Sequence, residues 1–357
     1  MRIAFDVSPL SHERTGVNNY IRGSLDGLAA VAREHGHEVV AFAPTSLAGP
    51  RAIREALAGV DVELRLVRLP GAHAWRTAWS VLGFPPAERW LGPLDVLHFS
   101  DWMFPPQRGG VRATTIHDLV PLHHPEWTTG RTRAMHGRKY RNAARSCDVI
   151  FVNSAFTADD VARTLGFARE RIVVAHPGVG EPFGVEGEAA DLGAPYVLTV
   201  ATLEPRKNLA TLVDAFALLD DGLSLAIVGG RGWGQQPQLD RPGVVRLGRV
   251  EDDELARLYR GAAAVVYPSR FEGFGMPITE AMACGAPVVA SSHASLDEAC
   301  GDAAVRADPE RPEAIAAAIR DAIARGDELR AKGLEHVRQF SWRRVGELFL
   351  EGYERYA

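Results

Sequence analysis

Short apolar runs alternate with longer segments of helical periodicity along the whole chain. The runs are rich in Val, Ile, Leu and Ala and are bounded by turn residues. Near-continuous runs of this kind indicate strands of parallel sheets that are covered on both faces. The expected strands are Ile3–Val7, Val39–Ala43, Glu63–Val67, Val96–His98, Ala113–Ile116, Val149–Val152, Ile172–Ala175, Tyr196–Val200, Leu223–Val228, Val244–Leu247, Ala264–Tyr267 and Val288–Ser291.

The segments between these runs carry the helical pattern. The expected helices are Asn18–Arg33, Arg51–Leu57, Arg133–Ala144, Leu209–Leu218, Asp252–Arg260, Pro277–Cys284 and Pro312–Ala324. Because the rhythm occurs twice, we predict an α/β fold with two Rossmann-like, doubly wound domains. Pro177–Pro195 is rich in Gly, Pro and acidic residues, which predicts a linker. We expect domains at residues 1–178 and 179–340, and a final segment, 341–357, whose helix packs back on the first domain.

The composition narrows the class of protein. Hydrophobic residues make up 46% and charged residues 24% of the 357 positions, which is typical of a globular chain. The net charge of -5 predicts no general attraction to nucleic acid. No run reaches the length that spans a bilayer, and no secretory leader is apparent. Three cysteines without metal-ligand spacing favour a reducing cytoplasm.

One strand-to-helix segment stands out as a candidate binding site, Ser269–Glu280. Two glycines in this loop let the backbone approach a ligand, and Pro277 suits the first position of a helix. Free N–H groups at such a helix start suit a phosphate. Glu272 and Glu280 are better placed to accept hydrogen bonds from sugar hydroxyls, although a capped turn is the simpler alternative.

A second strand-to-helix segment, Thr199–Leu209, carries Arg206 and Lys207 side by side. A guanidinium fork and a compact ammonium can together neutralise a diphosphate. Only three of the 40 basic residues are lysine, so a lysine beside an arginine is notable here. The alternative is a solvated helix start. Together the two segments offer cations, amide donors and carboxylates within the second half of the chain.

These two segments resemble glycosyltransferase family 4, a large family of retaining enzymes with the GT-B fold. The resemblance rests on FEGFGMPITEAMACGAPVVAS and ATLEPRKNL, and extends to FDVSPL, TGVNNY, TIHDLVPLHHP, VNSAFTADDV, AHPGV and FSWRRVGELFLEGY. It covers nearly the whole chain and implies two Rossmann-like domains that bind a nucleotide-sugar. Ala201 departs from the pattern, because relatives commonly carry glycine there.

The resemblance implies roles for single residues. Arg206 and Lys207 would hold the donor diphosphate, Glu280 the ribose, and Glu272 the transferred sugar. The remaining donor contacts would come from Gly16, Val250, Gly273, Phe274 and Gly275.

His117 follows an expected strand and would lie against the donor sugar by the same resemblance; a buried structural role is the alternative. Retention is implied by the family, and we expect front-face attack with the leaving phosphate as base. Asn18, Tyr20 and Trp102 are weaker candidates for the acceptor site. The arginine-rich stretch Arg131–Arg145 is usually a solvated helix face, and contact with an anionic membrane is the alternative.

Other classes fit less well. No G-x-G-x-x-G opens a domain and no glycine-rich loop ends in Lys-Ser or Lys-Thr, which disfavours dehydrogenases and P-loop hydrolases. Without an Asp-x-Asp pair we expect no catalytic metal, and we expect no cofactor besides the nucleotide-sugar substrate. The loop Gly229–Gly234 resembles a loop of family members that use GDP-mannose, and this resemblance favours GDP-mannose as donor. A UDP- or dTDP-sugar, an epimerase or phosphorylase on the same fold, and a non-catalytic sugar-nucleotide-binding protein stay open, as does the acceptor: a glycan, a lipid-linked sugar or a small molecule.

Overall fold

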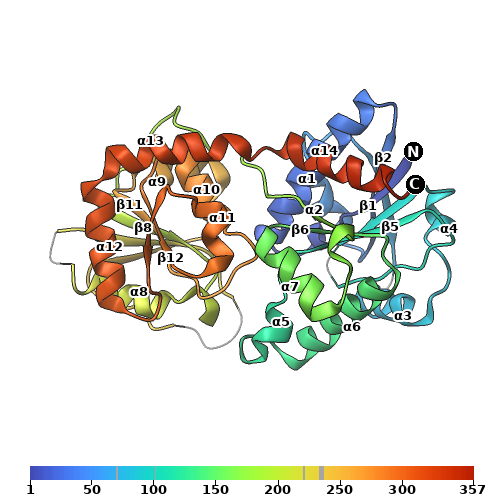
Figure 1. Ribbon diagram of the computed structural model, residues 1–357, viewed down its shortest axis with the longest axis horizontal. Helices are drawn as coiled ribbons and strands as arrows, with labels where there is room; N and C mark the ends of the chain where they lie inside the picture. The colour runs from blue at the N-terminus through green and yellow to red at the C-terminus, as the bar shows by residue number, and fades with distance from the viewer. Residues whose placement is uncertain (70, 101, 220–221, 233–236) are drawn as a thin grey trace. The chain divides into compact units, whose positions relative to one another are not determined.

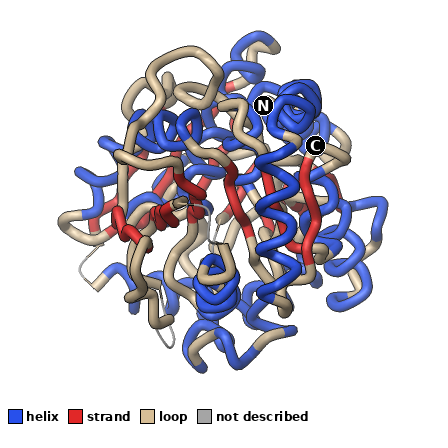
Figure 2. Tube along the Cα trace, turned by 90° about the vertical axis from the view of Figure 1, so that its left-hand side faces the viewer, coloured by secondary structure: helices blue, strands red, loops and turns tan. Residues whose placement is uncertain are grey.

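The computed structural model describes residues 1–69, 71–100, 102–219, 222–232 and 237–357. It divides into two compact units. Unit 1 comprises residues 1–123, 130–178 and 341–357, and unit 2 comprises residues 124–129 and 179–340. Each unit contains one parallel sheet, and Figure 2 shows helices on both sides of the strands.

Unit 1 is built on a sheet of seven strands in the order β3-β2-β1-β4-β5-β6-β7. All neighbours are parallel. The strands are β1 (Arg2–Asp6), β2 (Glu38–Thr45), β3 (Glu63–Arg68), β4 (Val96–Phe99), β5 (Val111–Ile116), β6 (Val149–Val152) and β7 (Ile172–Val174). The α-helices are α1 (Gly16–Glu34), α2 (Gly49–Ala56), α3 (Ala72–Leu82), α4 (Glu88–Leu91), α5 (Val120–His123), α6 (Gly130–Ser146), α7 (Ala155–Leu165) and α14 (Trp342–Glu354).

Unit 2 is built on a sheet of six parallel strands in the order β10-β9-β8-β11-β12-β13. The strands are β8 (Tyr196–Val200), β9 (Ser224–Val228), β10 (Val244–Gly248), β11 (Ala264–Tyr267), β12 (Val288–Ser291) and β13 (Ala304–Ala307). The α-helices are α8 (Leu209–Phe216), α9 (Asp252–Gly261), α10 (Met276–Ala283), α11 (Asp297–Cys300), α12 (Pro312–Ala324) and α13 (Gly326–His336).

Successive residues of the unit 2 strands feed two separate cores. Leu198 and Val265 pack with side chains of α9 and α10, while Val197 and Val266 pack with side chains of α8 and α12. This is the alternation that a pleated strand imposes, with both faces buried. Both cores need apolar residues, which explains why the strands read as continuous apolar runs.

The predicted α/β class with two doubly wound sheets is confirmed. The twelve expected strands are present, and their ends differ by at most two residues. β13 was not predicted, and among the helices of the described residues α3, α4, α5, α7, α11 and α13 were not predicted either. β13 is a short strand in which Arg306 interrupts the apolar run.

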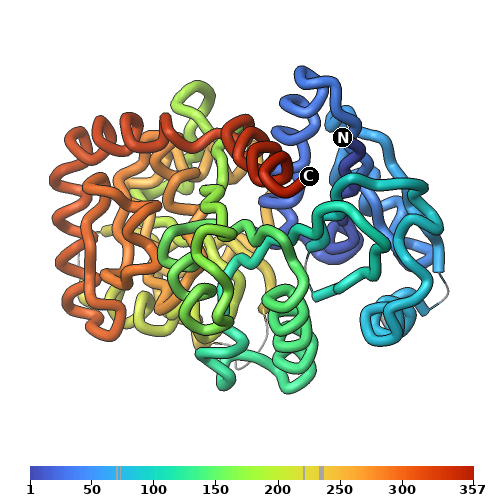
Figure 3. The backbone as a smooth tube through the Cα atoms, turned by 45° about the vertical axis from the view of Figure 1, so that its right-hand side comes forward, coloured from blue at the N-terminus to red at the C-terminus, as the bar shows by residue number. Residues whose placement is uncertain are grey.

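The last helix of the chain packs on the first. In Figures 1 and 3 the red α14 lies beside the blue α1, and both termini belong to unit 1. Glycines permit this close approach, because a Cβ on Gly27 would collide with the backbone of Trp342 and one on Gly346 with the backbone of Gly27. Within the part of the chain that the structure describes, no helix is both long and apolar enough to cross a bilayer.

Candidate active site

A tight turn after β8 presents the two cations of unit 2. Pro205–Lys207 forms one 3-10 turn, and Asn208 follows with a φ of 59°. Among the described residues Asn208 is the one non-glycine residue with positive φ, which asparagine tolerates better than most. Its Nδ2 donates to the carbonyls of Pro268 (3.2 Å) and Pro309 (2.6 Å). The turn is thereby tied to the loops after β11 and β13.

Glu272 lies between the two cations of this turn. Its Oε2 accepts from Nη1 of Arg206 at 2.6 Å, and its Oε1 accepts from Nζ of Lys207 at 2.6 Å. The Glu272 side chain is 8% exposed and that of Lys207 is 9% exposed. The backbone N–H of Glu272 donates to Oγ of Ser295, which fixes the loop. One buried carboxylate therefore bridges both predicted diphosphate ligands.

Two further side chains complete this cluster. Nε of Arg206 donates to Glu204 (3.1 Å), and Nζ of Lys207 donates to the hydroxyl of Tyr267 (2.7 Å). The formal charges of Arg206, Lys207, Glu204 and Glu272 sum to zero. Buried charges need such pairing, because an isolated ion loses its hydration. We call these four charged residues and Tyr267 the diphosphate cluster.

Charge and burial act on the cluster in opposite directions. Burial raises the pKa of Glu272, but Arg206 and Lys207 outweigh it and lower that pKa to about 2. Burial, and then the neighbouring Arg206, lower the pKa of Lys207, while Glu272 opposes this. Glu272 is thus a firmly ionised carboxylate that holds two cations in place.

The rest of the predicted donor segment forms the start of α10. Gly275 is its N-cap with a φ of 103°, a left-handed conformation that favours glycine. A Cβ there would lie 2.8 Å from Leu296, so the backbone is closely packed as well. Phe274 is 2% exposed and packs on Phe340, and Gly273 is buried beside it. Glu280 accepts from the hydroxyl of Tyr259 at 3.1 Å.

A hollow of ≈ 320 Å³ lies at the carboxyl ends of β9 and β10, and Leu203, Gly229, Arg246 and Gly248 are among its lining residues. Val250 follows on the next loop and packs partly buried against the core. Gly229 has a structural reason to be glycine, because a Cβ would collide with the carbonyl of Ala201. The end of the predicted loop, at Trp233 and Gly234, lies outside the described residues.

In unit 1, His117 directly follows β5 and is held by an amide. Nδ2 of Asn153 donates to Nδ1 of His117 at 3.1 Å, so the proton of the neutral ring belongs on Nε2. Nε2 is buried and has no hydrogen-bond partner among the described residues. Burial, and then the ammonium of Lys139, lower the pKa of His117 to about 3. His117 is therefore an uncharged donor at neutral pH.

The predicted acceptor residues are placed differently from one another. Tyr20 is 1% exposed, its hydroxyl donates to the carbonyl of Ala175, and its ring meets His117 edge-on. Asn18 caps α1, since its Oδ1 accepts from the backbone and hydroxyl of Thr15 and its Nδ2 donates to Pro9. Both side chains therefore hold local structure, and their contact with an acceptor stays a prediction.

The other two predicted site residues of unit 1, Trp102 and Gly16, differ in burial. Trp102 is 9% exposed, and the guanidinium of Arg76 lies 5.4 Å above its ring. Nε of Arg76 is buried without a hydrogen-bond partner in the described part of the chain. Gly16 is exposed at the first position of α1, and a Cβ there would meet nothing within 4 Å.

Sequence reasoning missed the partners that hold these side chains. Glu204 lies inside the segment Thr199–Leu209 and is its only acidic residue, which is a signal that the sequence itself offers. Asn153 lies inside the segment VNSAFTADDV, whereas Tyr267, Tyr259 and Arg76 come from other elements and carry no motif signal. Ala201 proves compatible with the turn, because its φ is not positive and its methyl group is buried.

Known proteins match the chain along most of its length. Residues 15–180 match the family model described as Glycosyltransferase Family 4, and residues 194–325 match Glycosyl transferases group 1. O-antigen chain mannosyltransferase B of Escherichia coli is 30% identical, covering 99% of this chain and 100% of that protein. A D-inositol 3-phosphate glycosyltransferase of Thermomonospora curvata is 28% identical, covering 98% of this chain and 94% of that protein.

Solved structures agree on the fold. HepE of Anabaena in complex with UDP-glucose superimposes with a TM-score of 0.71 at 16% identity, covering 99% of this chain and all of that chain. The sucrose-phosphate synthase of Thermosynechococcus elongatus gives 0.71 at 19% identity, covering 99% and 98%. The architecture is GT-B. From the family models and the relative at 30% identity, the chain belongs to glycosyltransferase family 4 and is a retaining, metal-independent glycosyltransferase.

Proposed function

We propose that this enzyme transfers mannose from GDP-mannose to a hydroxyl group of a growing glycan or glycolipid. The observation that carries the proposal is the position of Glu272 between Arg206 and Lys207, 2.6 Å from each. A site that already holds one anion between two buried cations is organised for a diphosphate.

The donor would displace Glu272 from both cations. A diphosphate and a carboxylate repel each other, so they do not share the same two cations stably. Glu272 would then turn to hydroxyls of the transferred sugar, as the family resemblance implies, while Glu280 accepts from the ribose. Arg206 and Lys207 would stabilise the charge that grows on the leaving diphosphate, which is where fixed cations contribute most to the rate.

The transfer itself would proceed with front-face attack. The bond from the anomeric carbon to the phosphate oxygen breaks, the acceptor oxygen bonds to that carbon, and the acceptor proton moves to the leaving phosphate. His117, neutral and protonated on Nε2, would donate to a hydroxyl of the sugar. Gly16 and Val250 would contact the donor, and Trp102 with Arg76 would border the acceptor.

Mannose is favoured because relatives across most of the chain are named mannosyltransferases. UDP- and dTDP-sugars are the alternative, since the similar HepE structure holds UDP-glucose. The family assignment favours transfer over the epimerase or phosphorylase chemistry considered from the sequence. The three free, buried cysteines support a cytoplasmic location.

A thermal-shift panel of GDP, UDP, dTDP and ADP tests the nucleotide, because a ligand that binds the folded state raises the melting temperature. We expect the largest shift with GDP. Transfer is then followed as release of GDP from GDP-mannose with mannosyl acceptors present. A larger shift with UDP or dTDP would overturn GDP-mannose, and absence of a shift with all four would count against the diphosphate site.

A further inference from the structure

Helix α3 turns an apolar face toward solvent. Trp79 and Arg76 are buried on its inner side, whereas Ala74, Ala78, Val81 and Leu82 are exposed. Spacings of four, seven and eight residues place these four on one helix face. Leu82 is 74% exposed and Phe84, just beyond the helix, is 72% exposed. Surface helices of globular proteins normally direct polar residues outward, so this stripe is unusual.

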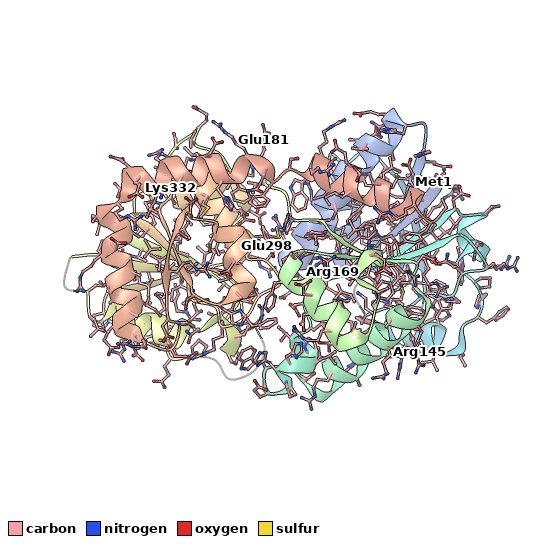
Figure 4. The ribbon with its side chains drawn as sticks, in the orientation of Figure 1. Met1, Arg145, Arg169, Glu181, Glu298 and Lys332 are labelled. Atoms are coloured by element: carbon pink, nitrogen blue, oxygen red, sulfur yellow. The ribbon has the colours of Figure 1, made fainter. Side chains whose placement is uncertain are left out.

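A row of arginines runs beside that stripe on α6. The helix has no acidic residue, and Arg131, Arg138 and Arg145 recur at intervals of seven, which places them on one face. Arg131 and Arg138 line a groove of ≈ 640 Å³ together with Val81 and Leu82, so α3 and α6 lie side by side. Arg145, labelled at the end of α6 in Figure 4, lines the adjoining hollow of ≈ 330 Å³ with Arg112.

Two of these arginines, Arg138 and Arg145, differ from several others on the surface. Arg325 pairs with Asp321 and Glu328, and Arg343 pairs with Glu34. For Arg138 and Arg145 no carboxylate lies within 4 Å in the described part of the chain. The chain carries a net charge of -5 and α6 has no acidic residue, so this row of arginines is a local feature and not a consequence of composition.

We propose that the surface formed by α3 and α6 binds an anionic lipid bilayer. This α3–α6 surface consists of Ala74, Ala78, Val81, Leu82, Phe84, Arg131, Arg138 and Arg145. The inference goes beyond the proposed function, since it involves none of the donor-site residues. Val81, Leu82 and Phe84 enter the boundary between headgroups and acyl chains, and the guanidinium groups bind lipid phosphates. An apolar stripe beside an arginine row can contact both the acyl chains and the charged headgroups of a bilayer surface. A free phosphate would contact only the arginines.

The test uses the full chain and vesicles of phosphatidylglycerol and phosphatidylcholine, compared with pure phosphatidylcholine, in a co-sedimentation assay. We expect binding to the anionic vesicles that weakens with salt. The variant R131Q/R138Q/R145Q should bind about a hundredfold more weakly, because each basic residue near an anionic surface is worth about fivefold in partitioning. The variant V81S/L82S/F84S should lose the binding that persists at high salt.

Two variants control for charge and apolar exposure. R51Q/R65Q/R169Q removes three arginines of unit 1 that pair with Glu55, Glu63 and Asp159, for the same change in net charge. L47S removes a side chain that is 73% exposed elsewhere. Both should bind vesicles nearly as the parent does. Melting temperature and nucleotide affinity, measured in parallel, show that each variant is folded.

Several results would overturn the proposal. One is that the protein binds both kinds of vesicle equally, or binds neither. Another is that R51Q/R65Q/R169Q loses as much vesicle binding as R131Q/R138Q/R145Q does. A third is that R131Q/R138Q/R145Q and V81S/L82S/F84S both bind vesicles as the parent does. If a soluble polyanion binds the arginine row as tightly as the vesicles do and V81S/L82S/F84S has no effect, the surface serves a soluble anion instead. The donor-site variant K207M should bind vesicles like the parent, which separates this proposal from the proposed transfer reaction.

Discussion

The candidate residues of the two units handle charge in opposite ways. In unit 2 the diphosphate cluster buries two cations and two carboxylates that neutralise one another at hydrogen-bond distance. In unit 1, burial and Lys139 keep His117 uncharged, and its Nε2 has no partner among the described residues. Preorganised opposite charges can exchange one anion for another, while a neutral imidazole can only donate or accept a hydrogen bond. Under the proposed function, charge stabilisation would therefore belong to unit 2 and orientation of the sugar to unit 1.

Removal of the Lys207 side chain is expected to give the largest effect and tests whether charge stabilisation belongs to unit 2. We expect K207M to lower kcat/KM by about a thousandfold, the effect of deleting one preorganised group that stabilises transition-state charge. It also leaves Glu272 with one cation in place of two, which should cost about 2 kcal/mol of stability. Release of the nucleotide from the donor and urea denaturation measure the two effects.

The third lysine provides a matched control. Lys332 belongs to the same unit, is 39% exposed and pairs with Glu328 on the surface. K332M should stay within about 0.5 kcal/mol of the parent, as surface substitutions usually do, and keep its rate. Equal losses in both variants would mean that K207M acts through general destabilisation.

Glu272 gives a smaller and more selective effect. E272Q keeps the shape of the side chain but removes the anion that competes with a diphosphate. We expect the affinity for free GDP to rise about fivefold, as the loss of roughly 1 kcal/mol of competition implies. Transfer should nevertheless fall about a hundredfold, because the carboxylate contact to the sugar is lost.

Calorimetric titration with GDP measures the nucleotide affinity of E272Q, and a transfer assay measures its loss of activity. E310Q serves as control, since Glu310 pairs with Arg270 on the surface of the same unit. Weaker binding of GDP by E272Q would contradict the displacement of Glu272 by the diphosphate. It would place the carboxylate among the groups that support the nucleotide.

His117 should act through its neutral form across the physiological range. With a pKa of about 3 it does not titrate between pH 5 and 9, so it should add no limb near pH 6.5 to the profile of kcat/KM. H117Q should lower kcat about tenfold without moving the remaining limbs, consistent with loss of one hydrogen bond to the sugar. A limb near pH 6.5 that H117Q removes would show that the imidazolium takes part.

The same shift predicts how stability depends on pH. His117 binds a proton less readily in the folded protein, with a pKa of about 3, than in the unfolded chain, where the value is 6.5. The contribution of His117 to the free energy of unfolding is therefore lost as pH falls from 6.5 toward 3. Asp6 acts in the opposite sense, because burial raises its pKa to about 6 and its contribution is lost as pH rises from 3.8 to 6. H117Q should flatten the loss on acidification, as measured by urea denaturation.

The sequence predicted the scaffold better than the site contacts, for a physical reason. Strands buried on both faces are apolar along their length, so runs such as Val149–Val152 were identified to the residue. Helix α3 was missed because Val81 and Leu82 point outward while Arg76 is buried, which removes the usual amphipathic pattern. Motif residues have fixed spacing, but their partners do not. Tyr267 reaches Lys207 across 60 residues, a distance that no local pattern encodes.

Gly16 gives the smallest expected effect and tests the contribution of unit 1 to the donor site. An added methyl group meets no atom within 4 Å, and the φ of Gly16 is not positive. G16A should therefore keep the melting temperature or raise it slightly, since Gly to Ala in a compatible conformation stabilises by about 0.4 to 1 kcal/mol. If the donor phosphates approach this backbone closely, KM for the donor should rise several-fold while kcat changes little.

The control for G16A needs a position where alanine causes no strain. G36A is a poor control, because the φ of Gly36 is 70° and alanine there is strained; S11A, beside the same loop, is better. An unchanged KM would mean that Gly16 does not contact the donor, and the phosphates would then be held by the diphosphate cluster of unit 2 alone.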